Sequence, residues 1–327
     1  MSAHLERYPA APLIRPQPAT CWILLLVLAL TVSACGRVTS AYSAQDFSGR
    51  TIRALATVGM VGDVVRNVGG ERVMVETLMG PGVDPHLYKP SESDVLDIAE
   101  ADAVFYAGLH LEGRMTEVLE RTSDTRPVVA VTEDTDHSRF RKSAAFEGSY
   151  DPHVWMDVSL WATTVDRVER ALIEMDPDSA AGYRARAAAY RKELAALHEY
   201  VRRQIATIPQ RSRVLVTAHD AFSYYGRTYG MEVRGLQGLS TETEAGVGDV
   251  QRLGTMLVDR HIKAVFIESS VPRRNIEAVQ AAARARGQQV TIGGELFSDA
   301  MGRAGTPEGT YIGMIRHNTD TIVRALR

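Results

Sequence analysis

The stretch from Asp178 to Ile208 constrains the fold of this chain most strongly, because it predicts one uninterrupted helix. It is rich in Ala, Arg, Glu and Leu, contains no Pro, and repeats its apolar residues at helical spacing. Pro177 precedes the stretch and Pro209 ends it. At 1.5 Å per residue, a helix of about 30 residues is roughly 45 Å long, which is more than one small domain needs. We therefore expect this helix to join two lobes.

Strands and helices alternate on both sides of the long stretch. Before it, apolar or β-rich runs predict strands at 52–59, 72–79, 103–106 and 127–131, with helices at 60–68, 91–100, 111–121 and 158–175. After it, the same patterns predict strands at 213–217, 231–236, 264–267 and 289–292, with helices at 221–229, 248–260, 275–286 and 309–326. This alternation is typical of parallel sheets covered by helices. The predicted fold is α/β, with an N-terminal lobe over 50–177, a linking helix over 178–208 and a C-terminal lobe over 209–327.

The first 34 residues have the features of an export signal. Arg7 and Arg15 give a positive start, and the apolar run from Trp22 to Leu30 is too short for a comfortable transmembrane helix. Val32-Ser-Ala-Cys35 resembles the lipobox of bacterial lipoproteins, in which the signal is cut before a Cys that then carries lipid. We expect a signal peptide over 1–34, lipidation at Cys35 and a flexible tether over 35–49. A plain signal peptide with a leftover Cys is the alternative.

Four side chains are candidate metal ligands. The tripeptide Asp-Pro-His occurs twice, ending at His86 and at His153, and its Pro makes a stiff corner that suits a ligand. His219 and Asp299 each follow a predicted strand of the second half. Ligands of open parallel sheets bind at the carboxyl ends of the strands, where loops converge. Three imidazoles and one carboxylate form a closed ligand set for a divalent transition metal such as manganese, zinc or iron.

The net charge and the ligand set favour some classes of function over others. A net charge of −3 lacks the basic surplus of a nucleic-acid-binding protein. A closed set of ligands contributed by two lobes is typical of a protein that captures a solute by closing around it. A secreted metal-dependent hydrolase needs an open coordination position and a general base, and the sequence contains no HExxH or nucleophile-elbow motif. A structural or adhesive lipoprotein is the third class, and it should not require all four ligands.

Seven motifs in register resemble the TroA-like (cluster A-I) family, the solute-binding lipoproteins of manganese and zinc ABC importers. They cover essentially the whole chain after the signal and read GVDPHLYKP (82–90), GLHLEG (108–113), DPHVWMD (151–157), TAHDAF (217–222), LQGLSTETE (236–244), FIESSV (266–271) and GGELFSD (293–299). The resemblance implies two (β/α)4 lobes joined by a long rigid helix, with one divalent cation held between the lobes. It places the ligands at His86, His153, His219 and Asp299.

The resemblance also implies a cellular setting, and several residues near the ligand positions have candidate roles of their own. We expect a monomer without enzymatic activity, exported and lipid-anchored in the periplasm or at the cell surface, that delivers its cation to a membrane permease. Asp157 and Glu268 are candidates to accept the second ring N–H of a ligand His, or else are loop or interface groups. His110 is expected to orient loops or lie near the rim, and Glu242 and Glu244 to cap the following helix.

The identity of the metal is inferred from one loop and one ligand. Zinc-dedicated relatives often insert a long loop rich in His and acidic residues between the first two ligand histidines, whereas here the 132–150 segment is short and contains only His137. Some manganese-dedicated relatives have Glu where this chain has His219, so the site remains acceptable to zinc. Manganese is favoured, zinc comes next and iron third.

Overall fold

The computed structural model of the 327-residue chain describes residues 47, 49–142 and 149–327. All of these belong to one compact unit, Ala44–Arg327. The predicted signal peptide, Cys35 and nearly all of the predicted tether lie outside the described residues. Within the part that is described, no helix has both the length and the apolar character needed to cross a bilayer.

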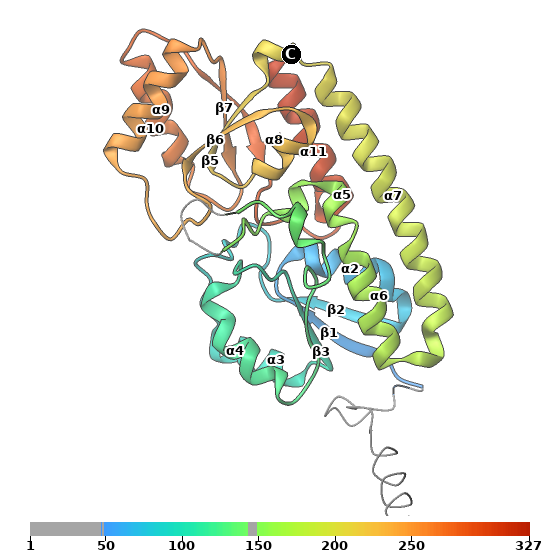
Figure 1. The fold of residues 1–327 in the computed structure, drawn as a ribbon. Helices are drawn as coiled ribbons and strands as arrows, with labels where there is room; N and C mark the ends of the chain where they lie inside the picture. Colours follow the sequence, from blue (N-terminus) through green and yellow to red (C-terminus); the bar gives the residue numbers. More distant parts are fainter. Residues whose placement is uncertain (1–46, 48, 143–148) are drawn as a thin grey trace, which may run out of the picture. The chain divides into compact units, whose positions relative to one another are not determined.

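The N-terminal half contains one parallel sheet in the strand order β2-β1-β3-β4 (Figure 1). Ala54 of the central strand β1 pairs with Val75 on one side and with Ala103 on the other. The strands are β1 (Ile52–Ala56), β2 (Val73–Thr77), β3 (Ala103–Tyr106) and β4 (Val128–Ala130). The helices are α2 (Gly59–Gly69), α3 (Glu92–Glu100), α4 (Thr116–Ser123), α5 (Val158–Trp161) and α6 (Thr164–Met175).

The C-terminal half repeats the arrangement with two pairs of parallel strands. β5 (Val214–His219) pairs with β6 (Glu232–Gln237), and β7 (Ala264–Glu268) pairs with β8 (Thr291–Leu296). β5 packs beside β7, so the two pairs lie side by side although no hydrogen-bonded ladder joins them within the described residues. The helices are α8 (Ser223–Tyr229), α9 (Val247–Asp259), α10 (Arg274–Arg284) and α11 (Tyr311–Leu326).

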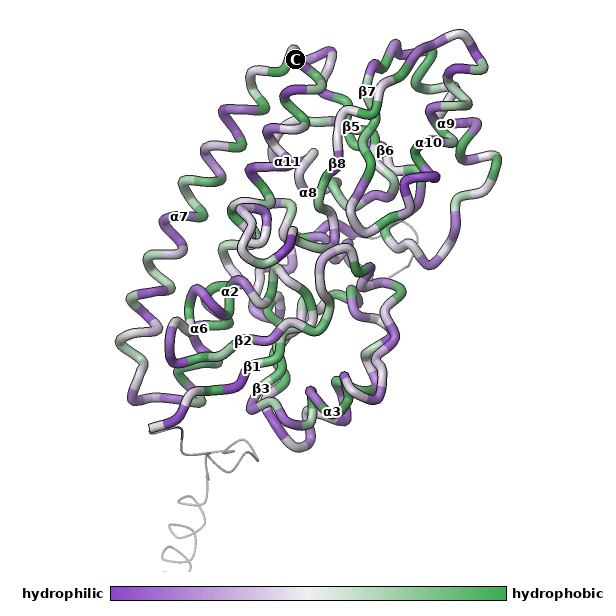
Figure 2. The backbone as a smooth tube through the Cα atoms, turned by 180° about the vertical axis from the view of Figure 1, so that it is seen from behind, coloured by the Kyte–Doolittle hydropathy of each residue, from purple (hydrophilic) through white to green (hydrophobic). Residues whose placement is uncertain are grey.

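Helix α7 (Ala180–Ala206) runs alongside both halves (Figure 1). It packs on α2, α5 and α6 of the N-terminal half and on α8 and α11 of the C-terminal half. Its buried residues recur every three or four positions: Tyr183, Ala187, Tyr190, Leu194, Leu197, Val201 and Ile205. Polar and apolar residues accordingly alternate along α7 in Figure 2, as expected for a helix with one buried side. The predicted fold class, two parallel α/β lobes joined by a long helix, is confirmed, whereas the exact lobe boundaries remain predictions.

Two predicted helices differ from the observed ones. The helix predicted over 158–175 is divided into α5 and α6, because the hydroxyls of Thr163 and Thr164 bond back to the carbonyls of Leu160 and Trp161 at the junction. The helix predicted from residue 111 begins only at Thr116, after a 3₁₀ turn over 113–115.

Candidate metal centre

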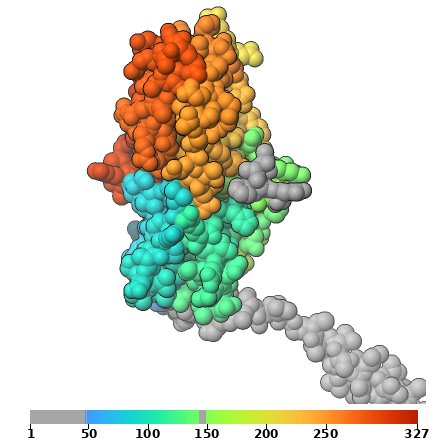
Figure 3. Space-filling view, turned by 90° about the vertical axis from the view of Figure 1, so that its left-hand side faces the viewer, coloured from blue at the N-terminus to red at the C-terminus, as the bar shows by residue number. Residues whose placement is uncertain are grey.

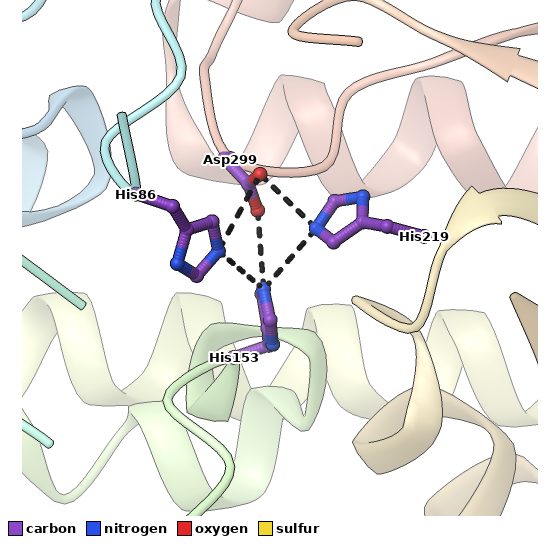
Figure 4. Close-up of side chains that lie close together, drawn as sticks. All are labelled: His86, His153, His219 and Asp299. Atoms are coloured by element: carbon purple, nitrogen blue, oxygen red, sulfur yellow. Dashed lines mark hydrogen bonds and ion pairs between the residues drawn. The ribbon is translucent and has the colours of Figure 1, made fainter. Parts of the chain in front are cut away.

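Four buried side chains from both halves of the chain point toward a common centre (Figure 4). His86 lies in the loop between β2 and α3, His153 directly before a 3₁₀ turn, His219 at the end of β5 and Asp299 in the loop after β8. One nitrogen or oxygen atom of each lies within 4.8 Å of those of the other three. The structure therefore brings together all four residues predicted from the sequence.

The distances between these atoms suit a tetrahedral ion. His153 Nε2 lies 3.3 Å from both His86 Nε2 and His219 Nε2. Asp299 oxygens lie 3.1 Å from His219 Nε2, 3.4 Å from His153 Nε2 and 4.0 Å from His86 Nε2. Bonds of about 2.0–2.2 Å at tetrahedral angles place ligand atoms about 3.3–3.6 Å apart. Small adjustments would therefore fit the four atoms around one cation.

The burial of the Asp299 carboxylate is the observation that most favours a bound cation. Asp299 is 1 % exposed, and within the described residues neither of its oxygens accepts a hydrogen bond, although both face imidazole nitrogens at ion-pair distance. A buried carboxylate without hydrogen bonds is costly, so natural proteins pair it with a positive charge or a metal. A cation at the centre of Figure 4 would satisfy both oxygens.

Two further carboxylates lie behind the imidazoles. Glu268 accepts the backbone N–H of His219 at 2.9 Å, and its other oxygen lies 2.6 Å from His219 Nδ1. Asp151 Oδ1 accepts the backbone N–H of His153 at 3.0 Å and lies 2.8 Å from His153 Nδ1. An ionised carboxylate only accepts, so each Nδ1 carries the proton and each Nε2 is left to face the centre. The role predicted for Glu268 thus matches its contacts.

The role predicted for Asp157 belongs instead to Asp151. Asp157 Oδ1 accepts from the backbone N–H groups of Ser159 and Leu160 and caps α5, while Oδ2 accepts the hydroxyl of Thr228. Within the described residues, neither oxygen of Asp157 has an imidazole as its partner. The repeated tripeptide was the available signal, because in both copies the Asp accepts the backbone N–H of the His two residues later.

The three imidazoles of the centre differ in how readily they take up a proton. Burial lowers the pKa of His86 to about 3. Burial also opposes a charge on His153, but Asp151 and Asp299 outweigh it and raise the pKa of His153 to about 9. Burial likewise opposes a charge on His219, but Asp299 and Glu268 outweigh it and raise the pKa of His219 well above the usual value. A cation must displace any proton on the Nε2 atoms, because only a neutral imidazole binds a metal.

Other candidates lie outside the cluster. His110 is exposed and has a positive φ of 64°, as does Leu109 before it, with 55°. Glu242 and Glu244 are exposed in the loop before α9, and Glu242 pairs with Arg114 at 2.9 Å. The cap of α9 is made by Asp249 and Gly246, so the prediction that Glu242 and Glu244 cap this helix was wrong.

Comparison with known proteins identifies the relatives of this chain. The family model for the zinc-uptake complex component A, periplasmic (ZnuA), matches residues 55–325. The manganese-binding lipoprotein MntA of Bacillus subtilis (strain 168) is 46% identical over 306 residues, which cover 93% of this chain and 97% of the relative. The zinc-binding protein TroA of Treponema pallidum (strain Nichols) is 49% identical over 272 residues, 83% of this chain and 88% of the relative. A solved structure of the periplasmic zinc-binding protein TroA from Treponema pallidum superposes with a TM-score of 0.82 at 48% identity, covering 84% of this chain and 99% of that one.

Proposed function

We infer the function of this chain from its family, because it belongs to the zinc-uptake complex component A family of metal-binding solute-binding proteins. It is the solute-binding component of an ABC importer for divalent metal ions. The family consists of transporter components rather than enzymes, which favours import over the hydrolase and the structural lipoprotein considered from the sequence. We further propose that the protein hands its cation to a membrane permease.

The buried cluster of three imidazoles and the Asp299 carboxylate carries this assignment. We propose that His86, His153, His219 and Asp299 bind one cation, because their facing atoms lie within 4.8 Å of one another. Glu268 and Asp151 support the proposal by fixing the imidazoles that they contact. The protein should bind zinc and manganese with one-to-one stoichiometry.

Titration calorimetry of single-site variants tests the proposed ligands. His219→Ala and Asp299→Ala should each weaken binding at least about 100-fold, because each removes one of four bonds to the ion. His317→Ala is the matched control, since His317 lies outside the cluster and contacts the carbonyl of Glu295. Unchanged affinity in both site variants would refute the proposed site.

We propose manganese as the physiological cargo, with zinc as the second candidate and iron as the third. The names of the relatives include both a manganese-binding lipoprotein and a zinc-binding protein. Affinity measured in vitro will favour zinc, because most sites with these donor atoms bind zinc more tightly than manganese. Growth of a strain that lacks the protein, starved separately of each metal, decides between them. Rescue of the mutant strain by added manganese but not zinc supports manganese, and rescue by zinc alone overturns it.

We also propose that the mature protein is a lipid-anchored monomer. The support is the Val32-Ser-Ala-Cys35 motif and the word lipoprotein in the name of its relative MntA. Cys35→Ala should prevent incorporation of radiolabelled fatty acid and move the protein from the membrane to the soluble fraction of the cells. Continued labelling of the variant would contradict lipidation at Cys35.

A further inference from the structure

The three other ligands are tied together more firmly than His86 is tied to any of them. His153 lies in the N-terminal half of the sequence, yet buried hydrogen bonds attach its segment to the C-terminal half. Trp155 donates from Nε1 to the carbonyl of Ser298 at 2.8 Å, next to Asp299, and Tyr311 donates to the carbonyl of Trp155 at 2.6 Å. The segment of His153 is therefore held in the same body as Asp299.

A third bond extends this attachment toward His219. Tyr224 of α8, which begins four residues after His219, donates its hydroxyl to the carbonyl of Asp151 at 3.0 Å. Asp151 in turn contacts the ring and the backbone of His153. His153, His219 and Asp299 thus share one network that includes α8, α11 and the loop after β8.

The loop that carries His86 is attached differently. Among the described residues, and apart from His86 itself, one hydrogen bond joins residues 80–90 to the C-terminal half: Thr241 Oγ1 donates to Asp84 Oδ2 at 2.5 Å. The other oxygen of Asp84 accepts the backbone N–H of His86 at 2.9 Å. A single carboxylate thus connects Thr241 to the backbone of a ligand.

Thr241 is itself held by the C-terminal half. Gln237, at the end of β6, donates from Nε2 to the carbonyls of Thr241 at 3.5 Å and of Thr243 at 3.1 Å, and its Oε1 accepts from Asn275 at 3.2 Å. A cavity of about 280 Å³ adjoins this loop and is lined by His86, Pro152, His110, Leu239 and Glu242. In Figure 3 the C-terminal half, in orange, meets the cyan and green N-terminal half along this face.

We propose that His86 is the ligand that separates from the other three when the ion enters or leaves, and that Thr241, acting through Asp84, is the positioning residue that holds His86 in place. This inference rests on the proposed metal-binding function. It adds that the four ligands divide into three that stay together, His153, His219 and Asp299, and one that moves, His86. The ion passes on the side of His86, where the cavity reaches the site, while His153, His219 and Asp299 stay together.

Release kinetics of bound zinc test the role of Thr241. Thr241→Val removes the hydroxyl and keeps the shape, and should accelerate zinc release into excess chelator about tenfold, the value of one hydrogen bond to a charged group. Thr241→Ser should restore slow release. Thr319→Val is the matched control, because Thr319 is also buried and bonds Tyr225 and its own helix α11.

A double-mutant cycle separates positioning from a general structural effect. In a His86→Ala background, Thr241→Val should cause no further acceleration, since the ligand on which Thr241 acts is gone. Equal acceleration in both backgrounds, or an effect of Thr241→Val no larger than that of Thr319→Val, would overturn the positioning role.

The three-and-one division has a test of its own. His86→Ala should keep three preorganised ligands and bind zinc about tenfold more tightly than His153→Ala. Equal affinities of the two variants would overturn the division. Failure of the wild-type protein to bind either zinc or manganese would instead refute the proposed function, whereas a wild-type protein that binds alongside the contrary variant results refutes this inference alone.

Discussion

Tyr190 in the middle of α7 donates its hydroxyl to Asp63 of α2, with 2.6 Å between Oη and Oδ2. Both side chains are buried, and burial raises the pKa of Asp63 above its ordinary value. The bond fixes the long helix to the N-terminal half at a buried point.

Tyr190→Phe should therefore destabilise the protein by about 1–3 kcal/mol, because Asp63 loses a buried donor. The melting temperature should fall by several degrees, measured by circular dichroism without added metal. Tyr200→Phe is the control on the same helix, since Tyr200 bonds Asp320 in an exposed contact and its loss should cost less than about 0.5 kcal/mol. Equal losses in both variants would contradict the importance of the buried bond.

The two aspartates on either side of His153 give a second prediction. Asp151→Asn should lower cation affinity about 10- to 100-fold, because the charge that orients and polarises His153 is removed. Asp157→Asn should leave affinity nearly unchanged, because Asp157 caps α5 and bonds Thr228. Calorimetry with zinc compares the two. A larger loss in the Asp157 variant would restore the role that the sequence predicted for it.

These aspartates also show where prediction from the sequence succeeds and where it stops. The strand and helix pattern, the long helix and the four clustered side chains followed from periodicity, from loop positions and from family resemblance. Which of the two aspartates reaches the imidazole of His153 depends on the backbone angles of the few residues between them. In the sequence DPHVWMD, Asp151 lies two residues before His153 and Asp157 lies four residues after it, and the turn that follows His153 directs Asp157 away to cap α5.

The sequence did not predict which half of the structure holds each ligand. Chain order groups His86 with His153 and His219 with Asp299. Contacts instead join His153 to the C-terminal half, through Trp155 and Ser298, which are 143 residues apart in the chain. Such long-range bonds leave no periodic signal, since one Trp in a loop is compatible with many partners.

A third prediction concerns acid stability at the start of α7. Burial would raise the pKa of Asp176, but hydrogen bonds from Ser179, Arg72 and Tyr183 outweigh burial and lower it. A lowered pKa in the folded state stabilises the protein above the ordinary value of 3.8, and this stabilisation is lost as the pH falls through the folded-state pKa. Asp176→Asn should thus be less stable than wild type near pH 7, and the difference should shrink below about pH 3.8.

Urea unfolding at several pH values measures this difference directly. Asp178→Asn serves as the control, because Asp178 is exposed two residues away and its replacement should have little effect at any pH. A stability difference for Asp176→Asn that stayed constant from pH 7 to pH 3 would show that the carboxylate charge does not contribute.

The last prediction links the cation to the stability of the whole unit. A cation that binds only the folded state stabilises it by about 2.7 kcal/mol at 100 times its Kd. For a unit of this size that corresponds to a rise in melting temperature of roughly 4–5 °C. Chelator should reverse the rise. Because the two Asp299 oxygens have no hydrogen-bond partner in the part of the chain that the structure describes, Asp299→Ala should abolish most of the rise, whereas the surface variant Asp178→Asn should retain it in full. A cation-dependent rise of wild-type size in Asp299→Ala would place the stabilising site elsewhere in the molecule.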